Sequence, residues 1–137
     1  MSEPIIVETH ISAPIARVWE YYTNPAHIVK WNFASDDWHC PHAESDLRPG
    51  GKFSSRMEAK DGSMGFDFAG VYDEVVPMER IAYTFGDRHA VVTFAPAGEG
   101  TQVTVSFDPE SENPIEMQRA GWAAILENFK KQCEVER

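Results

Sequence analysis

The sequence has few of the groups that would tie it to a nucleic acid or a membrane. Its 137 residues include only 12 Lys and Arg against 22 Asp and Glu, which gives a formal net charge of -10. A nucleic-acid-binding surface needs clustered basic residues, and no such cluster occurs, so we expect no nucleic-acid partner. No apolar run approaches the roughly 20 residues that a membrane-spanning helix requires, so we expect no membrane insertion.

Cysteine is also scarce, because Cys40 and Cys133 are the only two in the chain. The first ten residues, MSEPIIVETH, lack a basic start followed by a long apolar stretch, so they do not resemble a secretory signal. We therefore expect a cytoplasmic protein in which both cysteines are reduced thiols rather than a bridge.

Apolar and aromatic residues, by contrast, are plentiful. Hydrophobic residues make up 42% of the chain and aromatic residues 12%. This length and composition fit one domain over residues 1–137, with its core within about 4–133. Large rings fill such cores, but they also line apolar cavities that bind small molecules.

The first half of the chain predicts one strand and two short helices. Residues 5–11 are rich in β-branched side chains, which favours a strand. Pro14 and Pro25 each suit the first position of a helix, and apolar residues then recur at helical spacing. From 32 to 49 the periodicity is lost, which predicts a loop with a short strand near 43–48.

The second half predicts an antiparallel meander followed by a long helix. From residue 53 onward apolar residues alternate with polar ones, and short turns interrupt the alternation at 60–63, 76–80, 86–89 and 96–100. Over 113–133 apolar residues recur every three or four positions, which predicts a helix of about 20 residues. Asn113 is expected to cap this helix.

Large apolar side chains on these elements form a candidate ligand pocket. A curved sheet and a helix stabilise each other by covering each other's apolar faces, and a gap between them becomes a cavity where the side chains do not meet. The alternative is that the rings only fill the core. The predicted pocket residues are Trp31, Trp38, Phe53, Met57, Phe66, Phe68, Tyr72, Tyr83, Phe85 and Trp122.

The stretch DDWHCPHAESDLRPGG at 36–51 concentrates chemically active side chains. His39, Cys40 and His42 are of the types that bind zinc, but neighbours in an extended segment point apart, so we predict no metal site. Cys40 as a nucleophile with a histidine as its base is a second interpretation. The interpretation that we favour is a loop at the rim of the cavity, with Trp38 packed inward.

Arg56, Glu58 and Asp67 are the polar residues best placed for acid–base chemistry. If the turn centres on Asp61 and Gly62, Arg56 lies opposite Asp67 on the neighbouring strand. The alternation that sends the rings to one face sends these residues to the other, so we favour an ion pair on the outer face. An acid–base role would require the carboxylates to lie inside the cavity.

Several segments resemble the START-like (SRPBCC, helix-grip) superfamily. They are ISAPIARVWEYYTNPAHIVKW, DLRPGGKF, DGSMGFDFAGVYDEVVPMERIAYTF and GW at 121–122. Within that superfamily they are most similar to the branch named for the activator of the heat-shock-protein ATPase. The resemblance implies an α+β fold. A curved antiparallel sheet wraps around a long C-terminal helix, two short helices follow the first strand, and an apolar pocket lies between sheet and helix.

Three functions are compatible with these features. The first is binding of a small hydrophobic or aromatic molecule in the cavity, with no cofactor and no assigned reaction. The second is a cyclase or dehydratase type of enzyme, with acid–base chemistry from Tyr72, Tyr83, Glu58 or His39. The third is a stress-related co-chaperone that stimulates a chaperone ATPase and shows an exposed apolar patch. The expected partner is a small hydrophobic molecule, with a homodimer or a chaperone as alternatives.

Overall fold

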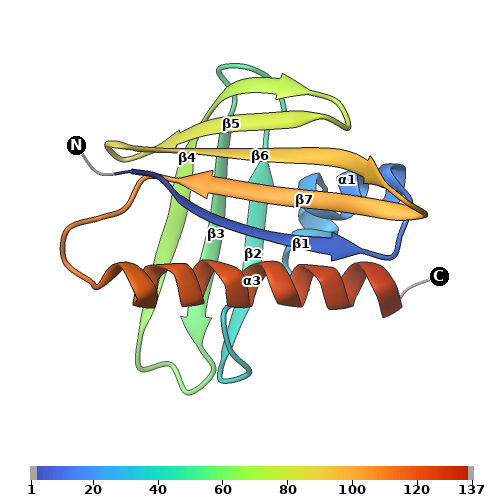
Figure 1. Ribbon diagram of the computed structural model, residues 1–137. Helices are drawn as coiled ribbons and strands as arrows, with labels where there is room; N and C mark the ends of the chain where they lie inside the picture. The colour runs from blue at the N-terminus through green and yellow to red at the C-terminus, as the bar shows by residue number, and fades with distance from the viewer. Residues whose placement is uncertain (1–2, 136–137) are drawn as a thin grey trace.

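A seven-stranded antiparallel sheet forms most of the computed structural model, which describes residues 3–135 (Figure 1). The strand order is β1-β7-β6-β5-β4-β3-β2, so β2 to β7 form a meander and β1 pairs with the last strand. The strands are β1 (Ile5–Ile11), β2 (Trp38–Ser45), β3 (Lys52–Ala59), β4 (Gly65–Val76), β5 (Arg80–Phe85), β6 (Arg88–Ala97) and β7 (Gly100–Phe107).

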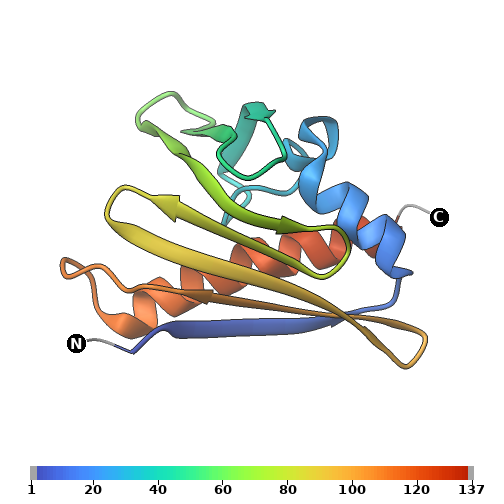
Figure 2. The same ribbon diagram turned by 90° about the horizontal axis from the view of Figure 1, so that it is seen from above.

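The sheet curves around the C-terminal helix α3 (Ile115–Val135), which packs against β1. In Figure 1, β1 and β7 run along α3, whereas β2, β3 and β4 cross behind it at a steep angle. The short helices α1 (Ile15–Thr23) and α2 (Pro25–Ile28) join β1 to β2 near the C-terminal end of α3 (Figure 2). The predicted α+β helix-grip fold, START-like in its element order, is therefore confirmed.

The register of β3 and β4 follows from the turn between them. The φ angle of Gly62 is +80°, a left-handed conformation that glycine adopts without strain. The side chain of Asp61 accepts a hydrogen bond from the backbone N–H of Ser63 at 2.9 Å, which stabilises the turn. Arg56 consequently lies opposite Asp67, as the sequence predicted.

The loop predicted from residue 32 is wrong for residues 38–42, which belong to strand β2, whereas the short strand predicted near 43–48 overlaps the last three residues of β2. This strand lies at one edge of the sheet. Its pairing with β3 shifts between His39 and His42, around Pro41. Proline and bulges are both confined largely to edge strands, and a bulge disrupts the alternation by which a strand is identified from sequence.

The start of α3 is held by Gln118 rather than by Asn113, so the predicted cap is wrong. The side-chain amide of Gln118 donates to the backbone carbonyls of Asn113 at 2.8 Å and Glu110 at 3.1 Å. Its carbonyl oxygen accepts from the backbone N–H of Glu110 at 2.9 Å. The Asn113 side chain instead donates to the Glu110 carboxylate at 3.0 Å. A buried glutamine thus ties the helix to the preceding loop.

The far end of α3 is tied to the connection between β1 and α1. Lys130 donates to the backbone carbonyl of His10 at 2.7 Å, and the backbone N–H of Ser12 donates to Glu134 at 2.8 Å. Hydrogen bonds therefore attach the start of α3 to the loop before it, and its far end to β1 and Ser12. Within residues 3–135, none of the helices is long and apolar enough to cross a bilayer.

The core lies between α3, the short helices and the concave face of the sheet. Its fully enclosed side chains include Phe107 of β7 and Phe129 of α3, at 1% and 0% exposure. Cys40 and Cys133 are both buried, and they do not form a disulfide bond. The ring of Phe129 contacts those of Tyr22 and Trp31. These contacts fill the space between the sheet and the C-terminal half of α3.

Candidate functional site

A pocket of about 180 Å³ lies between the sheet and the middle of α3. Residues of α1, α2, strands β2 to β5, β7 and α3 line it, and most of them are apolar. An engineered apolar cavity of about 150 Å³ is known to bind benzene. The pocket therefore has room for a molecule of one or two rings.

Eight of the ten predicted pocket residues line this space: Trp31, Phe53, Met57, Phe66, Phe68, Tyr72, Tyr83 and Trp122. Phe85 is buried beside it, with ring contacts to Phe68 at 5.3 Å and Trp122 at 5.8 Å. Trp38 lies at the start of the edge strand and contacts Phe66 at 6.0 Å. Neither Phe85 nor Trp38 lines the pocket, and binding of a ligand by the other eight stays a prediction.

Phe53 is at the centre of the aromatic wall that the sheet contributes. Its ring centroid is 5.0 Å from those of both Tyr72 and Tyr83. Gly70 lies opposite Phe53 on the neighbouring strand. A Cβ atom at Gly70 would come within 2.8 Å of the Phe53 ring and 2.2 Å of the Thr84 carbonyl oxygen. The missing side chain thus lets the ring lie across β4.

Sequence reasoning missed ten residues that line the pocket. Ser55 had a clear signal, because it alternates with Phe53 and Met57 on the inner face of β3, but only large side chains were selected. Tyr22 lies on the apolar stripe of α1, and its neighbour Thr23 gave no signal. The ten are Tyr22, Thr23, Ile28, Asn32, Glu44, Ser55, Ile81, Val105, Ile125 and Leu126.

Three tyrosines bring neutral phenol groups to the pocket. Burial raises the pKa of Tyr83 well above its usual value of 10.0, and the nearby phenols of Tyr22 and Tyr72 raise it further. Burial is also the largest cause of the raised pKa values of Tyr22 and Tyr72. The Tyr72 hydroxyl lies 2.7 Å from the Ser45 hydroxyl, and this hydrogen bond partly opposes the shift. All three phenols are therefore protonated near neutral pH.

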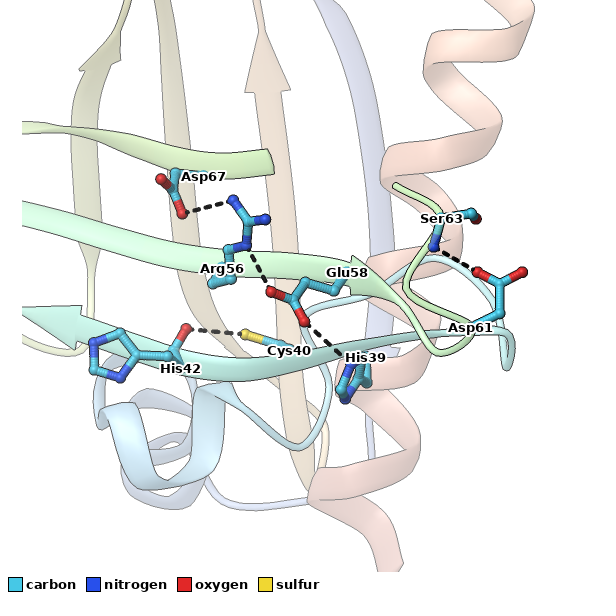
Figure 3. A network of polar contacts seen from close by, with 8 residues as sticks. All are labelled: His39, Cys40, His42, Arg56, Glu58, Asp61, Ser63 and Asp67. Atoms are coloured by element: carbon cyan, nitrogen blue, oxygen red, sulfur yellow. Dashed lines mark hydrogen bonds and ion pairs between the residues drawn. The ribbon is translucent and has the colours of Figure 1, made fainter. Parts of the chain in front are cut away.

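The carboxylates considered for acid–base chemistry lie on the outer face of the sheet (Figure 3). Arg56 contacts Glu58 at 2.9 Å and Asp67 at 3.5 Å, and the side chains of the two acids are 37% and 63% exposed. His39 lies 3.7 Å from the other oxygen of Glu58. None of these four side chains lines the pocket. The acid–base roles suggested for Glu58 and His39 in the cavity are therefore wrong, and the predicted outer ion pair of Arg56 and Asp67 is present.

The structure separates the three potential zinc ligands of β2 along the strand. The Cys40 thiol is buried and lies 3.5 Å from the backbone carbonyl of His42, whereas the His42 ring is exposed and lies 3.5 Å from Glu44. Among residues 3–135, no three His, Cys, Asp or Glu side chains gather as a metal site would require. Burial raises the pKa of Cys40, which disfavours the thiolate that a nucleophile needs.

Solved structures of bacterial proteins match this fold. An AHSA1-like protein from Aeromonas hydrophila is 41% identical, with a TM-score of 0.89 over 94% of this chain and 90% of that one. A protein from Cytophaga hutchinsonii is 50% identical, with a TM-score of 0.82 over 95% and 91%. A protein from Chromobacterium violaceum is 26% identical, with a TM-score of 0.83 over 97% and 99%. Among curated proteins, none matches the chain.

The family comparison agrees with these structures. The family model described as "Activator of Hsp90 ATPase homolog 1-like protein" matches residues 12–134, which is most of the chain. The match spans every element from α1 to α3, and β1 completes the sheet that those elements form. The chain therefore belongs to the family of activator of Hsp90 ATPase homolog 1-like proteins, as the resemblance in its sequence indicated.

Proposed function

We propose that the protein binds a small apolar or aromatic molecule in the pocket between the sheet and α3. The observation that carries this proposal is the composition of the pocket wall. Eight of its side chains are aromatic, and they surround a space of about 180 Å³. Concave, mostly apolar spaces with a few polar groups are the usual sites of small-molecule binding.

Burial of apolar surface is the driving force for such binding. A two-ring molecule that loses about 200 Å² of apolar surface to the pocket gains about 5 kcal/mol, at roughly 25 cal/mol per Å². Part of this gain is offset by the lost freedom of the ligand. We therefore expect dissociation constants of about 0.2 to 1 mM for a simple hydrocarbon.

The side of the pocket near Phe66 offers a route of entry. Phe66 lines the pocket and is nevertheless 48% exposed, so it lies at the mouth. Met64, in the turn before β4, is 65% exposed. Exposed apolar side chains at a mouth give an incoming apolar molecule its first contacts.

A matched pair of serine substitutions on β3 tests the proposal. Ser55 lines the pocket, whereas its neighbour Ser54 belongs to the other face of the strand. In Ser55→Leu the added side chain occupies the pocket, so binding of naphthalene, measured by equilibrium dialysis, should weaken at least 10-fold. Ser54→Leu adds the same atoms outside the pocket and should bind as the unmodified protein does.

Two results would contradict the proposal. One is undetectable naphthalene binding by the unmodified protein at concentrations up to its solubility limit. The other is equal binding by the two leucine variants. Thermal unfolding of each variant, followed by circular dichroism, shows that a loss of binding does not come from a loss of the fold. Native mass spectrometry of the protein as purified then searches for the natural occupant.

A co-chaperone function is the second candidate, and the family description favours it. The exposed side chains of Met64 and Phe66 would supply part of a contact surface for a chaperone. The discriminating measurement is the ATPase rate of the heat-shock chaperone with and without this protein. An unchanged rate removes this candidate. A cytoplasmic location belongs to both candidates, and it is consistent with Cys40 and Cys133 not forming a disulfide bond.

A further inference from the structure

Three hydroxyl groups line the pocket without a hydrogen-bond partner in the part of the chain that the structure describes. They belong to Tyr22, Ser55 and Tyr83. Ser55 and Tyr83 are each only 6% exposed. Within residues 3–135, the one fully enclosed polar side-chain atom that lacks a hydrogen-bond partner is Nδ1 of His27. The hydroxyl oxygens of Ser55 and Tyr83 are therefore not fully enclosed by protein atoms. Since both residues line the pocket, their hydroxyl oxygens open onto it.

An unpaired hydroxyl in an apolar wall destabilises the folded protein relative to the same side chain without it. Phenylalanine would fill the volume of the Tyr83 ring without this cost, as Phe53 and Phe68 do in the same wall. Residues that violate the rules of stable packing in this way are concentrated at functional sites. The Tyr83 hydroxyl is therefore best explained as a group that forms a hydrogen bond with a bound molecule.

The chemistry of a protonated phenol indicates what that molecule must offer. Tyr83 and Tyr22 both keep their protons, because burial raises their pKa values. A phenol O–H group donates one hydrogen bond, and a serine hydroxyl can add a second donor. The complementary group on the ligand is an oxygen atom that accepts hydrogen bonds.

The charges of the pocket wall disfavour an anionic oxygen. Among the described residues that line it there is no Lys, Arg or His, and Arg88, whose charge acts on Tyr83, lies outside the wall over the Phe85 ring. The one carboxylate residue among these described residues is Glu44, whose side chain is 70% exposed and lies 3.5 Å from His42. The whole chain carries a net charge of -10. A buried carboxylate without a cationic partner is strongly unfavourable, so the accepting oxygen must be neutral.

We propose that the pocket selects a neutral molecule of one or two rings that carries a carbonyl oxygen, such as a ketone, quinone, ester or lactone. The carbonyl accepts hydrogen bonds from Tyr83, with Tyr22 or Ser55 as the second donor, and the rings occupy the aromatic part of the wall. This inference rests on the proposed function, because it names the class of molecule that the same pocket binds.

Three naphthalene derivatives of similar shape test the inference. The first, 2-acetylnaphthalene, carries the carbonyl. In the second, 2-isopropenylnaphthalene, a CH₂ group replaces the oxygen, and the third, 2-naphthoate, is an anion. Equilibrium dialysis gives the dissociation constant of each with the unmodified protein and with Tyr83→Phe, Tyr22→Phe and Ser55→Ala. Ser54→Ala, on the other face of β3, is the matched control.

The measured quantity is the preference for the ketone, defined as the dissociation constant of the hydrocarbon divided by that of the ketone. Removing one neutral hydrogen bond should lower this preference about 5- to 10-fold in Tyr83→Phe relative to the unmodified protein. A smaller loss is expected in Tyr22→Phe or Ser55→Ala, and none in Ser54→Ala. The naphthoate should bind at least 10-fold more weakly than the ketone.

Two failures are distinguishable. If the hydrocarbon binds but the preference is the same in the unmodified protein and all three hydroxyl variants, or if naphthoate binds best, the carbonyl inference is wrong while the proposed function stands. If none of the three compounds binds, both are wrong. Tyr83→Phe should unfold at the same or a higher temperature than the unmodified protein, which separates a lost hydrogen bond from a lost fold.

Discussion

The indole of Trp122 lies flat against the ring of Phe107, with centroids 3.9 Å apart and 8° between the two planes. This contact joins the middle of α3 to β7. Two further rings, of Phe85 and Phe68, lie 5.8 Å and 6.1 Å from Trp122. Trp122 is thus held by strands β4, β5 and β7 at once, and it forms part of the pocket wall.

Replacing this indole should damage both stability and binding. We expect Trp122→Ala to lower the free energy of unfolding by about 3 kcal/mol, measured by urea denaturation, because a large ring is lost from several contacts. Naphthalene binding should weaken at least 10-fold. Arg56→Ala removes only exposed ion pairs on the outer face and should change both quantities little. Equal affinities in the two variants would count against the pocket as the binding site.

Two glycines should respond in opposite ways to the same substitution. A Cβ atom at Gly121, within α3, meets no other atom within 4 Å. Gly121→Ala should therefore stabilise the protein by about 1 kcal/mol and raise the unfolding temperature by about 3–5 °C, because alanine favours helix. The missing side chain at Gly121 is therefore not required for packing against the sheet.

Gly70 is the matched comparison on β4. There a Cβ atom would lie 2.2 Å from the backbone carbonyl oxygen of Thr84, which cannot move without shifting β5. Gly70→Ala should therefore destabilise the protein by about 2 kcal/mol. It should also weaken naphthalene binding, because the Phe53 ring must move. Differential scanning calorimetry measures the unfolding temperature of both variants. A lower unfolding temperature in Gly121→Ala, or an unchanged one in Gly70→Ala, would contradict the packing described for these two glycines.

The buried phenols should make the protein sensitive to alkali. In the unfolded chain tyrosines lose their protons near pH 10.0, whereas in the folded protein the pKa of Tyr83 is higher. Folding stability is therefore fully present below pH 10 and declines as the pH rises from there towards the folded-state pKa. Each such tyrosine should contribute a loss of about 1.4 kcal/mol per pH unit in this range.

Denaturant unfolding between pH 8 and 11, together with absorbance at 295 nm, measures this effect. Tyr83→Phe should have a shallower decline above pH 10 than the unmodified protein, and the comparison cancels the titration of lysines. Superimposable pH profiles for the two proteins would mean that the Tyr83 hydroxyl is hydrated rather than buried.

The fold was accessible from the sequence where a regular period covers a whole element. Alternation on β3 placed Phe53 and Met57 together on one face, and the turn at Asp61 fixed the partner of Arg56. Those local patterns agree with the tertiary structure because one face of the sheet covers the core and the other is exposed to solvent. The same patterns identified most of the aromatic wall.

Features that depend on distant contacts were not accessible. The bulge around Pro41 breaks the alternation of β2, and the first part of this strand was therefore predicted as a loop. Asn113 has the properties of a cap, yet its side chain binds Glu110 because Gln118, one turn later, occupies the helix start. Phe68 and Phe85 both follow the alternation of apolar and polar residues, but only Phe68 borders the pocket. Both rings contact Trp122 of α3, and the position of that residue cannot be read from the alternation.

Pro41 also limits how this protein can assemble. Strand β2 is one of the two edge strands, where a second copy could extend the sheet, but proline offers no N–H group and the bulge bends the strand. A continuous intermolecular sheet through β2 is therefore disfavoured. Any homodimer of this protein should be built from side chains rather than from backbone hydrogen bonds along that edge.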